Sequence, residues 1–212
     1  GLAPWLQKLP GGLIHVNVVG CALFAAISGS SAATVATVGK MSIPELRKRK
    51  YPEKILLGSL AGSGTLGLLI PPSIILIIYG VTVQESIAKL FIAGIIPGIM
   101  IALIFMGYVI VWSLLNKNKM PTNYENFSFL NKLSKSKQLI PVILLILGVI
   151  GSIYTGIATA TEAASLGVVG ALILSYFQKS LTLKTFKDSL LGATKTSCMI
   201  AFILAGATFL SL

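Results

Sequence analysis

The sequence predicts an all-α polytopic membrane protein, and three observations support this fold class. Hydrophobic residues make up 55% of the 212 residues and charged residues only 11%, and the mean hydropathy is +0.89. The apolar residues form long runs, and most basic residues lie between these runs. Because a soluble domain carries about 25% charged residues, a soluble enzyme, a disordered segment and a disulfide scaffold are excluded. At about 20–25 residues per span, the chain holds roughly five to seven membrane segments.

The distribution of charge predicts which loops face the cytoplasm. The chain has 17 Lys and Arg against 6 Asp and Glu, and most of the basic residues fall in three clusters, at 40–54, 117–137 and 179–195. Short basic loops mark the cytoplasmic side of a membrane protein. The stretches 81–89 and 154–161 lack such clusters and fit the opposite side. Nucleic-acid binding is not expected, because no aromatic residues alternate with the basic ones as a base-stacking groove requires.

The first membrane segment, residues 12–41, is predicted to be a re-entrant helical hairpin. Ser28-Gly29-Ser30-Ser31 interrupts the apolar run in its middle. The arms on either side, 13–27 and 32–41, are each too short to cross a hydrocarbon core of about 30 Å. The alternative is one long helix that tolerates small polar residues.

Residues 42–54 are predicted to be a cytoplasmic basic loop. It contains Arg47-Lys48-Arg49-Lys50, and Pro44 suits the first turn of a short surface helix within it.

The second membrane segment, residues 55–82, is predicted to be a discontinuous helix. Gly62-Ser63-Gly64-Thr65 adds backbone freedom, and the tandem prolines Pro71 and Pro72 remove two backbone donors. These prolines should leave carbonyls around Gly67 and Leu68 without helical partners, and Ser73 should start a second half-helix.

The later segments follow the same alternation of apolar runs and polar connections. The chain starts without Met and stops inside an apolar run, so it is expected to be part of a longer membrane protein. The predicted elements are a long helix within 83–115, a cytoplasmic linker over 116–138, spans near 139–155, 161–178 and 195–212 (the last truncated), and a surface helix near 181–190.

Two helix breaks in one membrane protein indicate a binding site. Unpaired peptide groups in hydrocarbon cost several kcal/mol each, so breaks persist only where protein or water covers them. Exposed carbonyls and hydroxyls can hold a cation, and half-helix N-termini can face an anion. The predicted site combines 28–31 with 62–65, and 71–73 lies nearby. The alternative is that the small residues merely allow close helix packing.

The remaining reactive side chains favour structural roles. His15 is interpreted as an interfacial polar residue rather than a proton relay. Glu162, with Thr159 and Thr161, is interpreted as a helix N-terminal cap rather than an intramembrane acid. Cys21 and Cys198 lie alone in apolar stretches. An intramembrane enzyme would need a nucleophile and a base or metal ligands, so no enzyme activity and no catalytic residue are predicted.

Four segments carry a resemblance to a known family. They are 24–34 (FAAISGSSAAT), 64–74 (GTLGLLIPPSI), 89–98 (KLFIAGIIPG) and 159–164 (TATEAA). In this order they resemble the large permease subunit of tripartite ATP-independent periplasmic (TRAP) transporters, the DctM-like family. One departure is Ala160, where the family usually has proline, and this weakens the cap at Glu162 without touching a proposed ligand.

The resemblance implies an inverted-repeat, elevator-type secondary transporter of the bacterial inner membrane. Residues 1–82 would belong to the transport domain, 83–115 to the scaffold and 139–212 to the start of a second repeat, whose own half-site lies beyond Leu212. The implied partners are a periplasmic substrate-binding protein, a small four-helix membrane subunit, the lipid bilayer and an organic acid of the C4-dicarboxylate or sialic acid type.

Sodium is the implied coupling ion, and no other cofactor is expected. A non-transporting scaffold subunit and a sodium/anion symporter without a binding protein remain as alternatives. The assigned sodium ligands are Ser28, Ser30, Ser31, Gly62, Ser63, Gly64 and Thr65, and the assigned substrate residues are Ser30, Ser31, Thr34, Pro72 and Ser73.

Overall fold

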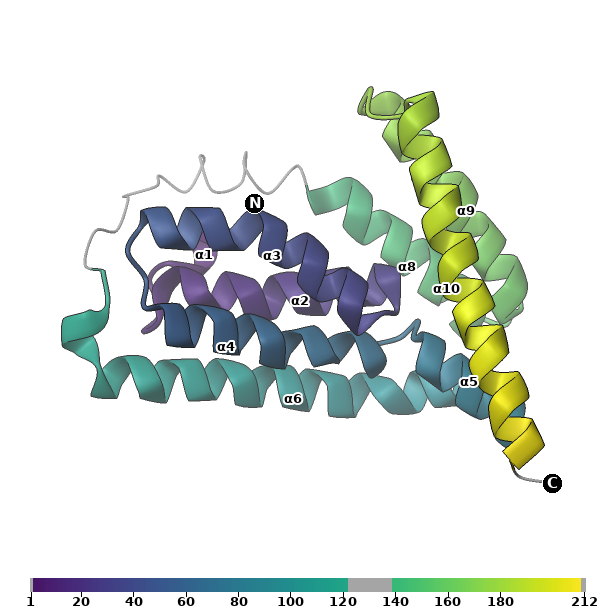
Figure 1. The fold of residues 1–212 in the computed structure, drawn as a ribbon, viewed down its shortest axis with the longest axis horizontal. Helices are drawn as coiled ribbons and strands as arrows, with labels where there is room; N and C mark the ends of the chain where they lie inside the picture. Colours follow the sequence, from purple (N-terminus) through teal and green to yellow (C-terminus); the bar gives the residue numbers. More distant parts are fainter. Residues whose placement is uncertain (1, 122–138, 211–212) are drawn as a thin grey trace. The chain divides into compact units, whose positions relative to one another are not determined.

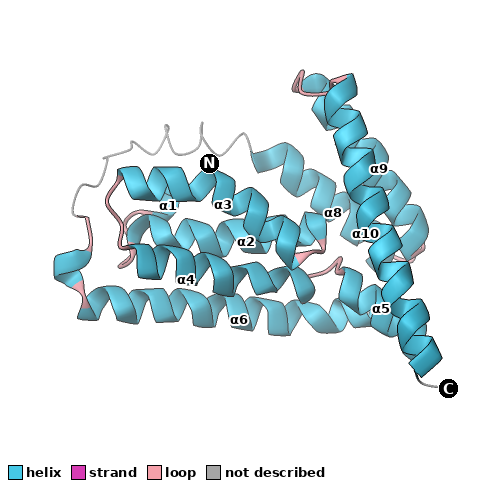
Figure 2. Cartoon of the chain, in the orientation of Figure 1, coloured by secondary structure: helices cyan, strands magenta, loops and turns pink. Residues whose placement is uncertain are grey.

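The computed structural model describes residues 2–121 and 139–210, and the regular structure of these residues is entirely helical (Figures 1 and 2). The chain divides into two compact units, residues 1–164 and 165–212. The α-helices are α1 (Ala3–Leu6), α2 (His15–Ser28), α3 (Ser31–Lys48), α4 (Glu53–Gly64), α5 (Ile74–Val83), α6 (Ile87–Leu115), α8 (Ile140–Tyr154), α9 (Ala160–Phe177) and α10 (Leu183–Leu210), and the short 3₁₀ turns are η1 (Gly12–Ile14), η2 (Thr65–Leu68) and η3 (Lys117–Lys119).

The helix–turn–helix form of the predicted hairpin is confirmed: helices α2 and α3 run antiparallel, and only Gly29 and Ser30 lie outside them at the tip (Figure 1). Gly29 ends α2 with a φ of 58°, which glycine adopts without a steric penalty. Its amide donates to the Ala25 carbonyl at 2.9 Å. Ser30 caps α3, because its Oγ accepts from the Ala33 amide. The tip is therefore shorter than predicted, since Ser28 and Ser31 belong to the helices.

The predicted loop 42–54 is wrong in extent, because α3 continues through Pro44 to Lys48. A proline removes one helical hydrogen bond, and local interactions offset this loss: Leu46 is buried at 2% exposure and Glu45 pairs with Arg49 at 2.6 Å. The helix ends in a Schellman motif with Lys50 at a φ of 60°. In this motif the Lys50 amide donates to the Arg47 carbonyl at 2.9 Å, and the Tyr51 amide donates to the Leu46 carbonyl at 3.0 Å.

The predicted discontinuity of the second segment is confirmed. Helix α4 ends at Gly64 and tightens into η2, residues 69–73 are not helical, and α5 begins at Ile74. The Pro71–Pro72 peptide bond in this break is cis. Helix α5 therefore starts as a separate half-helix at Ser73, as predicted, although the Ser73 side chain does not cap it.

Helices α2, α3, α4 and α6 share the core of the first unit. One cluster of buried side chains lies at the end of the unit that holds the α3–α4 turn and the end of α6: Leu13, Ile14, Leu46, Tyr51, Ile55, Leu56 and Val109. A second cluster joins Cys21, Val38 and Leu60 from α2, α3 and α4. Helix α6 also packs on the break, where a Cβ on Gly94 would lie 2.9 Å from the Leu69 carbonyl oxygen. The long helix predicted within 83–115 is thus part of the same core as the hairpin.

Three helices in the described part of the chain are long and apolar enough to cross a membrane: Ile87–Leu115, Ala160–Phe177 and Leu183–Phe209. The span predicted near 139–155 corresponds to α8, whose 15 helical residues rise about 22 Å, less than a hydrocarbon core of about 30 Å. Residues 122–138 of the predicted linker 116–138 lie outside the described residues, and 117–119 form η3.

The last span begins earlier than predicted, because α10 starts at Leu183 rather than near residue 195. The surface helix predicted near 181–190 and the span predicted from 195 are one continuous helix. Between them only Gly192 disfavours a helix, at a cost of about 1 kcal/mol, and no proline intervenes. The predicted surface helix and the predicted membrane span therefore differ in composition but belong to one helix.

Candidate functional site

The tip of the hairpin lies directly against the break in the second segment. The Ile74 amide, the first of α5, donates to the Gly29 carbonyl at 3.2 Å. A Cβ on Gly29 would lie 2.7 Å from the Pro72 carbonyl oxygen. A Cβ on Gly67 would lie 2.8 Å from both the Ser30 carbonyl carbon and the Ser31 nitrogen. Two segments far apart in the sequence thus meet backbone to backbone, which only glycine allows at these positions.

Four helix ends converge at this contact. Helices α3 and α5 begin there, and α2 and the α4–η2 segment end there. A helix N-terminus carries about half a positive charge and a C-terminus about half a negative charge. The junction therefore offers favourable positions to one anion and to one cation without any charged side chain.

Three hydroxyl groups predicted as ligands instead brace the tip and the break. Thr34 is fully buried, and its hydroxyl donates to the Ser30 carbonyl at 2.8 Å and lies 2.9 Å from Ser28 Oγ. Ser73 is also fully buried, and its hydroxyl donates to the Leu68 carbonyl at 2.6 Å. The Leu68 carbonyl, which was predicted to have no partner within a helix, is thus bonded by the Ser73 side chain in the break.

Ser31 stands out among the predicted ligands. Its Oγ is buried and has no hydrogen-bond partner among the described residues. A buried hydroxyl without a partner costs about 1–3 kcal/mol. Such an atom at the junction of two helix breaks is suited to accept a ligand. No group of three or more His, Cys, Asp or Glu side chains that could hold a metal occurs in the described part of the chain, so a cation there would be held by neutral oxygens.

The predicted glycine–serine stretch of α4 reaches this junction only in part. A Cβ on Gly64 would overlap Val35 and lie 3.9 Å from the Ser31 carbonyl oxygen, so Gly64 faces the hairpin. The other predicted residues point elsewhere. Gly62 faces Phe105 of α6, the Ser63 hydroxyl donates to the Ser59 carbonyl at 2.6 Å, and the exposed Thr65 hydroxyl donates to the Gly62 carbonyl at 2.7 Å.

Two positions in this region are absent from the predicted ligand set. Gly67 lies against the backbone of the tip. Its spacing of three residues from Gly64 could have indicated this, because residues i and i+3 lie on one helical face. Asn17, fully buried in α2, donates to the Leu56 carbonyl at 3.1 Å and to Ser59 Oγ at 3.0 Å. A polar side chain within an apolar helix could have indicated Asn17 from the sequence. Its two hydrogen bonds join α2 to α4.

The structure shows the local contacts of the two isolated ionisable residues, and it bears out the capping role of Glu162. His15 is buried, and its Nε2 lies 2.8 Å from the Pro10 carbonyl oxygen, in the turn before α2. Glu162 forms a capping box with Thr159: its carboxylate accepts from the Thr159 amide at 2.8 Å, and the Glu162 amide donates to Thr159 Oγ1 at 3.3 Å. Glu162 therefore lies in the first turn of α9 and caps it, as interpreted from the sequence.

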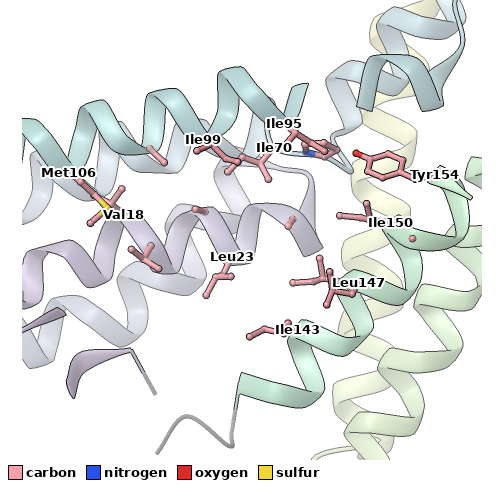
Figure 3. A pocket seen from close by; sticks show the side chains of 17 residues that line it. Val18, Leu23, Ile70, Ile95, Ile99, Met106, Ile143, Leu147, Ile150 and Tyr154 are labelled. Carbon is pink, nitrogen blue, oxygen red and sulfur yellow. The ribbon is translucent and has the colours of Figure 1, made fainter. Parts of the chain in front are cut away.

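An apolar cavity of about 580 Å³ lies beside this junction in the first unit. Its walls come from α2, α6, α8 and the residues of the break, including Ile70 and Pro71 (Figure 3). The lining holds one polar side chain, Tyr154, and none of the serines of the tip. A charged solute would lose its hydration there without a polar partner, so this cavity is not the site of an anion.

The comparison with known proteins agrees with this architecture. The model of the DctM component of the tripartite ATP-independent periplasmic transporter matches residues 5–212. The C4-dicarboxylate TRAP transporter large permease protein DctM of Pseudomonas aeruginosa is 37% identical over 198 residues, which cover 93% of this chain and 46% of that protein. The sialic acid TRAP transporter permease protein SiaT of Haemophilus influenzae is 37% identical over 205 residues, or 96% of this chain and 33% of that protein.

A third relative is the ectoine/5-hydroxyectoine TRAP transporter large permease protein UehC of Ruegeria pomeroyi. It is 35% identical over 209 residues, which cover 96% of this chain and 47% of that protein. The chain thus spans about half or less of the curated relatives it matches. With a match over nearly its whole length and helices long enough to cross a bilayer, the chain belongs to the DctM component family of tripartite ATP-independent periplasmic transporters and is a multi-pass protein of the bacterial inner membrane.

Proposed function

We propose that the chain forms half of the solute site in the permease of a sodium-coupled secondary transporter for organic acids. The observation that carries this proposal is the docking of the hairpin tip into the helix break, beside the buried, unpartnered Ser31 Oγ. A non-transporting scaffold subunit has no need for such a junction, because peptide groups released from a helix in hydrocarbon are costly.

The sodium ion would bind at the C-terminal helix ends of the junction. Ser31 Oγ and backbone oxygens near Gly64 and Gly67 are neutral, hard ligands of the kind that suits a small cation. Ser28 and Ser30 support this position through the hydrogen bonds of the tip. The side chains of Ser63 and Thr65 take no part, because their hydroxyls are bonded to the carbonyls of Ser59 and Gly62.

An organic acid would bind at the N-terminal helix ends of the same junction. The α5 amides after Ile74 and the first amides of α3 lack helical acceptors, as in any helix start, and they favour a carboxylate. Thr34, Pro72 and Ser73 then act by shaping and bracing these two helix starts. The relatives are named for C4-dicarboxylates, sialic acid and ectoine, so the solute class is that of small organic acids.

In an elevator movement, α6 would travel with the hairpin. The resemblance assigned residues 83–115 to the scaffold, but Gly94 and Gly98 lie against Leu69 and Ile70 in the break, and Val109 lies in the buried cluster beneath α2 and α4. Sliding α6 past these residues would open a close-packed core. We therefore include α6 in the transport domain, with a periplasmic binding protein and a small membrane subunit as partners of the whole permease.

Substitution of Ser31 tests the sodium site. In the full-length permease, Ser31→Ala removes the only tip hydroxyl that is free to bind an ion, and it leaves the braces at Ser28 and Thr34 intact. We expect the sodium concentration for half-maximal uptake to rise about tenfold, equivalent to about 1.4 kcal/mol of lost binding. Uptake into liposomes at a series of sodium gradients measures this, with Thr65→Ala as the matched control. An unchanged sodium dependence in Ser31→Ala would rule out the site.

The orientation of the first unit can be tested with single cysteines. In a background where Cys21 and Cys198 are alanine, a cysteine at Lys48 should resist a membrane-impermeant thiol reagent added to intact cells. One at Gln84 should react, because the basic α3–α4 turn faces the cytoplasm. Gel-shift labelling of the two variants measures this, and permeabilised cells supply the control in which both react. The reverse pattern would invert every assignment of sides.

A further inference from the structure

We propose that the end of the first unit formed by the α3–α4 turn and the end of α6 is a binding surface for anionic phospholipid headgroups. This inference concerns the lipid contact of the chain and does not depend on the proposed transport activity. It rests on five exposed lysines, on the absence of acids to pair with them in the described residues, and on their depth in the bilayer. These lysines are Lys48, Lys50, Lys54, Lys117 and Lys119.

One buried cluster gathers the five lysines at the same end of the unit. Leu46, Tyr51 and Ile55 of the α3–α4 region pack with Val109 of α6. Trp112 and Met120 cover the same cluster, so the chain on both sides of η3 is fastened to it. Figure 1 shows the α3–α4 turn and the end of α6 at this one end. Lys117 and Lys119 in η3 therefore lie beside the turn that carries the other three.

The acids at this end are already occupied. Glu45 pairs with Arg49 at 2.6 Å, and Glu53 pairs with Arg47 at 2.7 Å. The hydrogen bond from Arg49 lowers the pKa of Glu45, and that from Arg47 lowers the pKa of Glu53. Both of these acids pair with arginines, so among the described residues neither is left to pair with the five lysines. Around the start of α6, by contrast, the sequence has one acid, Glu85, and one base, Lys89.

If α6 crosses the bilayer along its normal, its length would bring these charges to the level of the phosphates. Its 29 residues rise about 43 Å, which matches the thickness of about 40–45 Å of a bilayer with its headgroup layers. Its last residue, Leu115, then lies among the headgroups, and Lys117 and Lys119 follow at once. Clusters of four to eight basic residues at the cytoplasmic end of a membrane helix bind anionic lipid at about 1 kcal/mol per residue, or about fivefold in affinity.

The test compares phosphatidylglycerol with phosphatidylcholine around the full-length permease. Spin-labelled forms of both lipids are added to the reconstituted protein, and electron paramagnetic resonance gives their relative association. We expect a preference for phosphatidylglycerol that weakens in high salt. In the five-site variant, Lys48, Lys54, Lys117 and Lys119 are replaced by Gln, and Lys50 is replaced by Gly, which suits the positive φ there. The preference for phosphatidylglycerol should fall at least fivefold in this variant, which is the contribution of one lysine.

The matched control is Lys89→Gln, which removes one exposed lysine of the same helix at its other end and should leave the preference unchanged. If the five-site variant does not fold, the double variant Lys117→Gln, Lys119→Gln decides, since it leaves the α3–α4 turn intact; it should lose part of the preference. A wild-type preference in the folded five-site or double variant overturns the proposal. So does a stronger effect of sodium phosphate than of sodium chloride at equal ionic strength, which would indicate a site for free phosphate.

Discussion

Replacing Gly67 with alanine should abolish uptake by the full-length permease while leaving its insertion in the membrane intact. The added Cβ would lie 2.8 Å from the Ser30 carbonyl carbon and the Ser31 nitrogen, and 2.9 Å from the Ser30 carbonyl oxygen. These are backbone atoms, so no side-chain rotation can relieve the overlap. The tip must move away from the break, at a cost of about 1–3 kcal/mol in unfolding free energy. Liposome uptake and thermal unfolding in detergent measure the two effects.

Gly58→Ala is the matched control for this change. Gly58 lies on the same helix as Gly64, and a Cβ there would meet nothing within 4 Å. The substitution should retain uptake and stabilise α4 by up to about 1 kcal/mol, since alanine favours a helix over glycine. A tenfold loss of uptake corresponds to a barrier change of about 1.4 kcal/mol. If Gly67→Ala retains more than about a tenth of wild-type uptake, the tip and the break need not touch.

Replacing Pro71 and Pro72 together with alanine should also abolish uptake in a permease that inserts normally. Each proline costs about 3 kcal/mol in a helix interior, so the alanines favour continuation of η2 into α5. A continuous helix would take the Ile74 amide away from the Gly29 carbonyl and the Ser73 hydroxyl away from the Leu68 carbonyl. The half-helix start of α5, which we assign to the organic acid, would disappear. Sodium-driven uptake and the amount of protein in the membrane are the measurements.

Pro44→Ala controls for the loss of a proline as such. Pro44 is exposed inside α3, away from the tip, so its replacement should leave uptake unchanged and make the helix slightly more stable. Wild-type uptake by the double-alanine variant would mean that the break is an accident of packing, and the half-helix site would have to be abandoned.

The sequence alone was sufficient for the helical membrane class, the hairpin and the broken helix. These features depend on local composition: apolar runs of limited length, small polar residues at 28–31, and two adjacent prolines. It also indicated the capping role of Glu162, because a capping box is read from residues three apart. It was less successful where composition changes without a change of conformation. The basic residues after Met41 and those before Thr196 were assigned to loops or surface helices, yet α3 and α10 continue through them.

Only the tertiary structure showed which of the small polar side chains are already hydrogen-bonded. Ser28, Ser63, Thr34 and Ser73 look alike in sequence, but their hydroxyls are bonded to carbonyls or to one another, while Ser31 Oγ is left without a partner. These bonds of the four hydroxyls are local, because each joins residues four to six positions apart, but Ser31 also lies against Gly67 of the other segment, a contact that no local pattern encodes. The same holds for α6: its sequence predicts a long helix, but its place in the core of the hairpin follows from glycines that meet the break. Local chemistry determines where the chain breaks, and close packing determines what each break faces.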